Sequence, residues 1–355
     1  MNITFFSPTL NPGGYEKVVV AFANELSKNS ENSITILCCD AQGKLRNEIS
    51  SNVTVTSFNC RTKSLLPHLI LYFRKSNIDV FYTGFRIYNF IALLARSISN
   101  ADFKICCSQH GYENSSKFMI YMYRLLINRS DLFLGVTKNV LRYETQILNI
   151  RCNCDVLGNP VISNIEIMTI EDNWFDDNIP IIVTCGRLSI DKNYILAIKI
   201  LKKLLDMGYK FKLLMIGDGP EKNKIEELVD KFDLNNFVKM IGYVSNPIDY
   251  MSKCDIYLHT CNQEGFGNTV VEAMYAGLPI VTTYCGGPVD LIDDGVYGRF
   301  FGKENNDNMD VQGAKTVLQV YLDKDKYINQ RKRALDFTSK NITSLLYEKF
   351  KNILD

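Results

Sequence analysis

The types and spacing of two glutamates, Glu264 and Glu272, give the clearest indication of the chemistry that this chain could perform. Glu264 lies in a glycine-rich turn after an apolar run, 255–260, that predicts a β-strand. Glu272 lies in the opening turns of a predicted helix beginning near Asn268, a residue type suited to capping helix amides. A strand, a glycine-rich loop and a helix place ligands at the carboxyl end of a parallel sheet. Ionised carboxylates there accept strong hydrogen bonds from hydroxyl-rich ligands such as sugars and riboses. The alternative is two solvated surface acids, which the flanking glycines disfavour because they permit close backbone approach.

A second loop, Gly186-Arg-Leu-Ser-Ile-Asp-Lys-Asn193, offers positive charge after a predicted strand at 180–185. Arg187 and Lys192 can both reach one pocket from this loop. Arginine presents a planar fork to phosphate, and lysine presents a compact charge. Together they could neutralise a diphosphate without a metal ion. The alternative is an exposed loop with two unrelated basic side chains.

Residues of the first half could complete such a site. Gly13 and Gly14 follow the predicted strand 3–7 and open the predicted helix 15–27, where backbone amides suit phosphate or another anion. This turn differs from the GxGxxG pattern of dinucleotide enzymes. His110 directly follows the predicted strand 103–108. A lone histidine more often serves packing or hydrogen bonding, but its position at a strand end favours a functional role.

Apolar runs alternate with helical patterns along the whole chain, which predicts the α/β class with parallel sheets. A length of 355 residues favours two domains. We expect a Rossmann-like domain at 1–165, a linker at 166–179 and a second Rossmann-like domain at 180–355, with a last helix at about 341–355 that could pack back on the first domain. Two such halves place a ligand in the crevice between them. Further strands are predicted at 33–39, 53–58, 79–82, 132–136, 211–217, 237–242 and 279–283.

Composition narrows the class of protein. Residues 1–170 hold 17 Lys and Arg against 12 Asp and Glu, whereas the remainder holds 23 basic and 27 acidic side chains. A moderately basic first half fits a phosphate-rich ligand or anionic lipid headgroups, and no nucleic-acid motif is present. We expect no signal peptide and no transmembrane helix. Eleven cysteines without framework spacing indicate reduced thiols and a cytoplasmic location. The segment 61–75 could rest on an anionic membrane, or be an ordinary surface helix.

Five motifs together resemble the retaining glycosyltransferases of family 4. They are GGYE at 13–16, GRLSIDKN at 186–193, GDGPE at 217–221, EGFGNTVVEAMYAGLPIV at 264–281 and GGP at 286–288. That family has the GT-B fold, in which two Rossmann-like domains face a central cleft. The resemblance spans nearly the whole chain and is most specific in the second half. One departure is Val289-Asp290, where many relatives carry Arg-Glu.

The resemblance implies roles for the residues that match. Arg187 and Lys192 would hold the nucleotide diphosphate, Glu264 would contact donor-sugar hydroxyls, and Glu272 would contact the ribose. The remaining positions would surround the donor: Gly13 and Gly14 near the phosphates, the amides of Phe266, Gly267 and Asn268 facing it, and His110 near the transferred sugar.

The implied reaction is transfer of a hexose or N-acetylhexosamine, with retention, from a nucleotide sugar to a saccharide acceptor that could be lipid-linked. UDP is the commonest donor nucleotide in similar enzymes, and synthesis of O-antigen, capsule or exopolysaccharide is the expected setting. Neither a cofactor nor a metal is expected. We expect alanine at Arg187 or Lys192 to lower turnover about tenfold or more. A peripheral position on the inner membrane, through 61–75, fits a lipid-linked acceptor. Two alternatives stay open: a nucleotide-sugar epimerase, and a nucleotide-sugar-binding protein without turnover.

Overall fold

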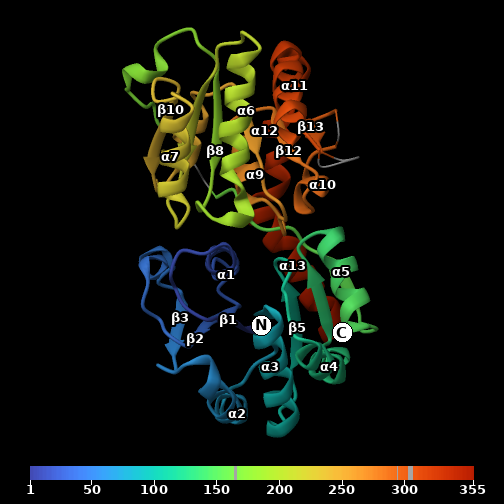
Figure 1. Ribbon diagram of the computed structural model, residues 1–355. Helices are drawn as coiled ribbons and strands as arrows, with labels where there is room; N and C mark the ends of the chain where they lie inside the picture. Colours follow the sequence, from blue (N-terminus) through green and yellow to red (C-terminus); the bar gives the residue numbers. More distant parts are fainter. Residues whose placement is uncertain (164–165, 294, 303–306) are drawn as a thin grey trace. The chain divides into compact units, whose positions relative to one another are not determined.

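The chain folds into two compact units (Figure 1). The computed structural model describes residues 1–163, 166–293, 295–302 and 307–355. The first unit comprises Met1–Ser163 together with Phe337–Asp355, and the second comprises Asn164–Asp336. Each unit is a parallel sheet with helices, which confirms the predicted α/β class and its two Rossmann-like parts.

The sheet of the first unit has the strand order β3-β2-β1-β4-β5-β6-β7, and every pairing in it is parallel. The strands are β1 Asn2–Ser7, β2 Ser33–Cys38, β3 Val53–Ser57, β4 Val80–Gly84, β5 Lys104–Gln109, β6 Leu132–Gly135 and β7 Cys154–Val156. The helices are α1 Gly14–Leu26, α2 Leu65–Lys75, α3 Arg86–Ser99, α4 Lys117–Leu126, α5 Lys138–Leu148 and α13 Ser339–Leu354.

The sheet of the second unit repeats this topology, with the order β10-β9-β8-β11-β12-β13 and parallel pairing throughout. The strands are β8 Ile181–Cys185, β9 Lys212–Ile216, β10 Val238–Gly242, β11 Ile256–His259, β12 Ile280–Thr283 and β13 Gly298–Phe301. The helices are α6 Tyr194–Asp206, α7 Lys222–Lys231, α8 Pro247–Met251, α9 Asn268–Tyr275, α10 Gly287–Leu291, α11 Met309–Leu322 and α12 Gln330–Ala334.

The strand sequences explain why these sheets form. Central strands such as β4 and β8 are buried along their whole length, as expected where helices cover both faces of a parallel sheet. Their apolar runs made them easy to predict, and the predicted boundaries agree with the structure to within about two residues. The edge strands β7 and β13 were not predicted because they are short and carry polar or charged residues.

The last helix, α13, belongs to the first unit. Phe350 is fully buried, and its ring lies 6.5 Å from that of Phe5 and 6.4 Å from that of Tyr82, between ring centroids. Lys349 forms an ion pair with Asp155. The C-terminal segment therefore completes the core of the first unit.

The stretch 166–179, expected as a linker, packs on the second unit. The backbone amide of Met168 donates to Asp249 at 2.8 Å. Trp174 accepts a hydrogen bond from Lys212 on its carbonyl at 2.8 Å, and the Lys212 ammonium lies 4.7 Å from the indole ring. These contacts tie the beginning of the second unit to its sheet.

Candidate functional site

The order of strands brings two loops together in the second unit. Strands β8 and β11 are neighbours, although β9 and β10 lie between them in the sequence. The chain order reverses at this point, and in open α/β sheets ligands bind beyond the carboxyl ends of the strands at such a switch point. The loop 186–193 follows β8, and the loop 260–267 follows β11.

Hydrogen bonds fasten these two loops to each other. Thr260 donates from its hydroxyl to the carbonyl of Lys192 at 3.0 Å, and the amide of Asn262 donates to the carbonyl of Asp191 at 2.8 Å. Glu264 is held from its other side, because its amide donates to the carbonyl of Cys285 at 2.7 Å. Backbone contacts on both sides therefore fix the position from which each charged side chain extends.

The side chains of Lys192 and Glu264 form an ion pair, with Nζ 2.5 Å from Oε2. Both are largely buried, with 23% and 15% of the side-chain surface exposed. Burial alone would raise the pKa of Glu264, but the hydrogen bond with His259 and the charge of Lys192 outweigh it and lower the pKa to about 2. Glu264 is therefore a carboxylate at any physiological pH.

His259, the last residue of β11, is the third member of this group. Its Nε2 lies 3.3 Å from the same Oε2 of Glu264, and its side chain is 5% exposed. Burial alone would lower the pKa of His259, but hydrogen bonds with Cys261 and Glu264 raise it above 6.5. Sequence analysis missed this residue. The signal that selected His110, a histidine at the end of an apolar strand, applies equally to His259.

The His259–Glu264 contact makes a pH-dependent prediction. Since the pKa of His259 is raised by folding, its stabilising effect is complete below about pH 6.5 and is lost as the pH rises through the raised value. A hydrogen bond to a charged group contributes about 1.5–3 kcal/mol. We therefore expect His259→Gln to lower Tm by several degrees at pH 6 and by less at pH 9.

The thermal transition can be followed by tryptophan fluorescence, since the only tryptophan, Trp174, belongs to the second unit. His68→Gln is the matched control, because His68 lies on α2 in the first unit, where its ring bonds the Ser64 carbonyl at the helix start and no described carboxylate forms an ion pair with it. An equal loss at both pH values for His259→Gln would contradict a protonated histidine on Glu264.

His259, Cys261 and Glu264 are also residue types that bind metals, and their ligand atoms lie within 4.8 Å of one another. The ammonium of Lys192 bonds the carboxylate of this set and would repel a divalent cation. A network of hydrogen bonds and opposite charges accounts for the cluster more directly. Independence from metals stays a prediction.

Helix α9 begins where the sequence predicted, but its cap is a different residue. Gly267, at φ +100°, is the N-cap, and Asn268 is the first helical residue. The expectation that Asn268 caps the helix is wrong, because only glycine adopts this left-handed conformation readily. Gly287 is also required: a Cβ there would lie 2.3 Å from the carbonyl oxygen of Phe266. The N-terminus of α9 is thus presented beside Glu264, and its amides suit an anion. Glu272 lies one turn further along α9, partly exposed.

Arg187 lies on the same loop as Lys192, but its side chain is exposed. Among the residues that the structure describes, none forms an ion pair with it within 4.0 Å. The structure thus brings Lys192 to Glu264 and leaves the Arg187 guanidinium in solvent. Whether both bases bind one phosphate group stays a prediction.

His110 in the first unit has a different electrostatic character. Its Nε2 lies 3.0 Å from the Ser108 hydroxyl and 3.2 Å from the Tyr82 hydroxyl, and its ring packs edge-on against Tyr15 at 4.8 Å. Although part of the residue reaches the surface, the enclosure of the ring lowers its pKa to about 4. His110 is therefore neutral at pH 7, able to exchange hydrogen bonds but not to act as a cation.

The predicted glycine turn does open the first helix. Gly13 is the N-cap of α1 and Gly14 its first residue, both at least partly exposed. The neighbouring strand β4 leads into Phe85, a non-glycine residue at φ +65° whose ring contacts Tyr15 at 4.9 Å. Such strained residues persist only where the surrounding structure holds them. The turn after β1, the turn after β4 and His110 after β5 thus lie at one edge of this sheet.

A buried ion pair supports the His110 loop. Arg86 bonds Glu144 through two parallel contacts, Nε to Oε2 at 2.9 Å and Nη2 to Oε1 at 2.7 Å, and the two side chains are 2% and 0% exposed. Arg86 Nη1 also donates to the carbonyl of Glu113 at 2.7 Å and to the Ser115 hydroxyl at 3.2 Å. The segment from His110 to helix α4 is thereby anchored to α3 and α5.

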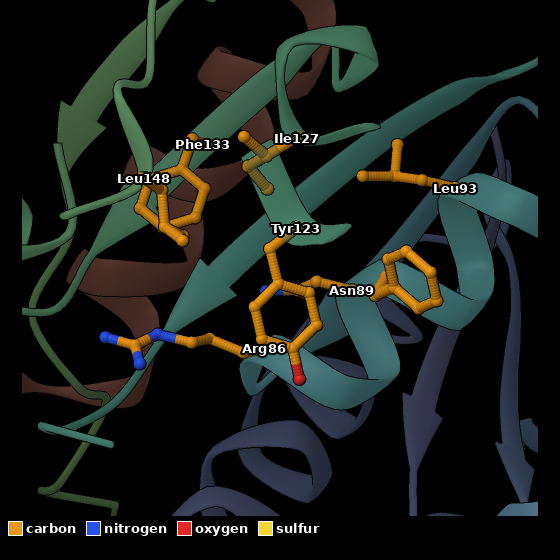
Figure 2. Close-up of a pocket in the computed structure, with 8 residues that line it drawn as sticks. Arg86, Asn89, Leu93, Tyr123, Ile127, Phe133 and Leu148 are labelled. Carbon is orange, nitrogen blue, oxygen red and sulfur yellow. The ribbon is translucent and has the colours of Figure 1, made fainter. Parts of the chain in front are cut away.

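Figure 2 shows a pocket that begins at Arg86 and continues between α3, α4 and β6. Its volume is about 10 Å³, at the lower limit of what one water molecule requires. We interpret it as a packing gap of the core rather than a ligand site. Its lining residues are Arg86, Asn89, Phe90, Leu93, Tyr123, Ile127, Phe133 and Leu148.

Comparison with known proteins gives a consistent result for both units. Residues 169–335 match the family model of glycosyl transferases group 1, and residues 12–163 match that of glycosyltransferase family 4. The N-acetylgalactosamine-N,N'-diacetylbacillosaminyl-diphospho-undecaprenol 4-alpha-N-acetylgalactosaminyltransferase of Campylobacter jejuni is 27% identical over 348 residues, covering 92% of this chain and 93% of that protein.

Two further proteins are similar, one over part of the sequence and the other in its fold. The O-antigen biosynthesis glycosyltransferase WclY of Escherichia coli is 27% identical over 186 residues, covering 52% of this chain and 48% of that protein. The crystal structure of Anabaena HepE in complex with UDP and glucose superposes with a TM-score of 0.81 at 19% identity, covering 99% of this chain and 100% of that chain.

Proposed function

Since the chain is a glycosyltransferase that belongs to family 4 and has the GT-B fold, we propose that it transfers a hexose or N-acetylhexosamine from a nucleoside diphosphate sugar, most favourably a UDP-sugar, to a saccharide acceptor carried on a lipid. The product would be a surface polysaccharide or a related glycan. The Campylobacter relative acts on a diphospho-undecaprenol substrate and the WclY relative in O-antigen biosynthesis, which supports this class of acceptor and this setting.

The observation that carries the proposal is the Lys192–Glu264 pair at the switch point of the second sheet. Lys192 and His259 both contact the Glu264 carboxylate at Oε2, and among the described residues Oε1 has no partner. An ammonium has three donors, so Lys192 keeps two after bonding Glu264. A nucleotide sugar could use both groups. A sugar hydroxyl could donate to Oε1 of Glu264, and the diphosphate could accept from the two remaining donors of Lys192.

The proposed reaction proceeds on one face of the sugar, with retention. As the bond from the anomeric carbon to the diphosphate loosens, a donor phosphate oxygen takes the proton of the attacking acceptor hydroxyl. Lys192 and Arg187 stabilise the negative charge that builds up on the leaving diphosphate, together with the amides at the start of α9. Glu264 orients the sugar. Its carboxylate also stabilises the positive charge that develops on the sugar ring as the bond to the diphosphate breaks. We propose that the reaction needs neither a metal ion nor a cofactor.

The remaining candidates take binding roles in this scheme. Glu272, one turn into α9, accepts hydrogen bonds from the ribose hydroxyls. His110, neutral at pH 7 because its pKa is lowered to about 4, exchanges a hydrogen bond with the transferred sugar rather than holding phosphate by charge. Gly13 and Gly14, at the start of α1, would allow close backbone approach to an anionic group of a ligand.

A thermal-shift experiment tests the donor class. We expect a nucleoside diphosphate, tried as UDP, GDP and ADP with CMP for comparison and with EDTA present, to raise Tm of the transition that Trp174 reports. A ligand at a hundredfold over its Kd adds on the order of 3 kcal/mol of stability, or about 6–12 °C for a unit of this size. Glu272→Ala should reduce the shift because the ribose contacts are lost.

Glu226→Ala is the matched control, since Glu226 lies on α7 of the same unit and its one ion pair with a described residue is the exposed pair with Lys222. A full shift in Glu272→Ala would remove the ribose role. Absence of a shift with every nucleotide would contradict the proposed donor site, and a shift without sugar transfer to any acceptor would favour a binding protein.

A further inference from the structure

Two cysteines of the second unit lie close together beside the loop that carries Glu264. Cys261 follows β11 and Cys285 follows β12, and these two strands are neighbours in the parallel sheet. Both residues are buried, at 0% and 5% exposed. Although they are far apart in the sequence, their thiols share a hydrogen bond. The fold therefore brings two thiols together at the edge of the sheet where the candidate donor site lies.

Backbone contacts hold the two cysteine segments against each other. Beyond the ends of β11 and β12, the pairing resumes where Glu264 bridges to Gly286. Between these points, the Thr283 hydroxyl donates to the Cys261 carbonyl at 2.5 Å, and the Glu264 amide donates to the Cys285 carbonyl at 2.7 Å. Neighbouring strands lie about 4.8 Å apart, and a disulfide spans about 4.4–6.8 Å between Cα atoms. The backbone therefore brings the two cysteines into the range of a disulfide.

The two thiols differ in acidity. The hydrogen bond between them lowers the pKa of the Cys285 thiol. The same bond raises the pKa of the Cys261 thiol, and burial raises it further. The thiolate is the form of cysteine that attacks oxidants and disulfides. Cys285 is therefore the thiol that reacts first, and Cys261 is the neighbour that can react with the product.

A cavity of about 440 Å³ lies against this pair, beside the start of α6. Its lining includes Cys261 and Asn262, and also Thr283 and Tyr284, which directly precede Cys285. One water molecule needs about 10–15 Å³ of such space, so the cavity admits small polar molecules. Hydrogen peroxide, which is little larger than water, can therefore reach the two thiols although the residues are buried.

We propose that Cys261 and Cys285 form a redox site, which hydrogen peroxide oxidises to a disulfide and a small thiol reduces again. The Cys285 sulfur attacks one peroxide oxygen, the O–O bond breaks, and the released hydroxide leaves as water with the thiol proton. The Cys261 sulfur then attacks the resulting sulfenic acid. The S–S bond forms, the S–O bond breaks, and a second hydroxide leaves as water with the Cys261 proton. The two thiols lose two electrons, which the peroxide accepts.

A second close pair of thiols, Cys152 and Cys154, lies in the first unit. The Cys154 thiol donates to the Cys152 carbonyl at 3.2 Å, and Cys152 Sγ lies 3.2 Å from the Ser130 hydroxyl. This pair lies at the amino end of β7, whereas the candidate site loops follow the carboxyl ends of strands. A disulfide there would join residues two apart in the sequence and leave the loops of the second unit as they are. The experiment must therefore tell the two pairs apart.

Oxidation of Cys261 and Cys285 would act on the candidate donor site through Glu264. A disulfide draws the two sulfur atoms to about 2.05 Å, and it removes the thiol hydrogen that Cys261 offers to the Gln263 carbonyl, 2.9 Å from its Sγ. Glu264 is the next residue, and its amide bonds the Cys285 carbonyl, so the contraction moves Glu264 and with it Lys192. A displacement of about 1 Å can cost about 10²-fold in rate.

We therefore expect the disulfide to weaken binding of a nucleoside diphosphate at least tenfold. This consequence rests on the proposed function, whereas formation of the disulfide does not.

Fragment mapping of the full-length protein tests the disulfide. After treatment with hydrogen peroxide, free thiols are blocked with N-ethylmaleimide and the chain is cleaved after glutamate. Cleavage at Glu264 and Glu272 puts Cys261 and Cys285 on separate fragments. We expect these fragments to be joined in wild type and separated by dithiothreitol. Cys285→Ser and Cys285→Ala should lack the joined species. Cys254→Ser is the matched control and should retain it, because Cys254 is the other cysteine of the fragment that carries Cys261.

The effect on the donor site is measured on the same samples, as the Tm shift with UDP, GDP and ADP. We expect peroxide to raise the apparent Kd of the nucleotide that binds at least tenfold in wild type, with recovery in dithiothreitol. In Cys285→Ser, the Kd should be the same before and after peroxide.

Three outcomes would overturn the redox site. They are no joined fragments in oxidised wild type, loss of the joined fragments in Cys254→Ser, and oxidation of Cys285 to a sulfinic acid that dithiothreitol does not reverse. Joined fragments with an unchanged Kd would overturn the effect on the donor site. Absence of a nucleotide shift in reduced wild type would instead contradict the proposed function, and the fragment map would still decide whether the disulfide forms.

Discussion

Lys192→Ala is expected to lower the rate of sugar transfer by about 10²–10³-fold, the loss typical of removing one preorganised group that stabilises transition-state charge. The structure explains why one side chain has so large an effect. Lys192 is three-quarters buried, bonds Glu264 at 2.5 Å and is held by the hydrogen bond from Thr260 to its own carbonyl. Its charge is therefore fixed in place before the donor binds.

The thermal-shift experiment identifies which nucleoside diphosphate raises Tm, and the corresponding nucleotide sugar is the substrate. The rate can then be measured as the release of that nucleoside diphosphate. Lys224→Ala is the matched control, because Lys224 belongs to the same unit but is exposed and pairs with Glu221 on the surface. Tm must be recorded in parallel to separate misfolding from lost catalysis. A folded Lys192→Ala protein with activity within threefold of wild type would show that the ammonium is not part of the reaction.

Comparison with Glu264→Gln adds a second test of the pair. If Lys192 and Glu264 act as a unit on the donor, the double variant should lose little more activity than the worse single variant, because coupled catalytic residues are not additive. If instead the losses of activity in the two single variants multiply in the double variant, the ion pair has only a structural role.

Glu144→Ala is expected to lower the free energy of unfolding by about 3–5 kcal/mol, because it leaves the buried Arg86 guanidinium without its carboxylate. The corresponding fall in Tm is about 6–20 °C for a unit of this size. Burial raises the pKa of Glu144 in spite of the hydrogen bonds from Arg86, which shows how strongly this environment disfavours an unpaired charge. Circular dichroism is the appropriate measurement, since the first unit has no tryptophan.

Two controls isolate the cause. Arg86→Met/Glu144→Leu removes both charges and should recover at least half of the loss, since apolar residues can replace a buried pair at little cost. Glu348→Ala breaks an exposed pair with Lys351 on α13 of the same unit and should change stability by less than about 1 kcal/mol. A loss no larger in Glu144→Ala than in Glu348→Ala would contradict the buried-charge argument.

Much of this molecule was predictable from its sequence because the relevant signals are local. The alternation of apolar runs and helical patterns gave the α/β class and most element boundaries, since each buried strand of a parallel sheet is apolar along its length. Lys192, Glu264 and Glu272 could be selected by their place in strand–loop–helix units. The same reasoning misplaced the cap of α9, because the left-handed conformation of Gly267 depends on how the loop packs against α10.

Only the tertiary structure decided which charged groups meet and which surfaces stay open. Lys192 and Glu264 are 72 residues apart, and their contact depends on β8 and β11 being neighbours, an order that no local pattern encodes. Helix α4 is apolar around most of its circumference, so periodicity could not tell which side the core covers. The sequence by itself determined the elements and the chemistry available to them, whereas packing selected the partners, because burial and pairing energies depend on side chains far apart in the chain.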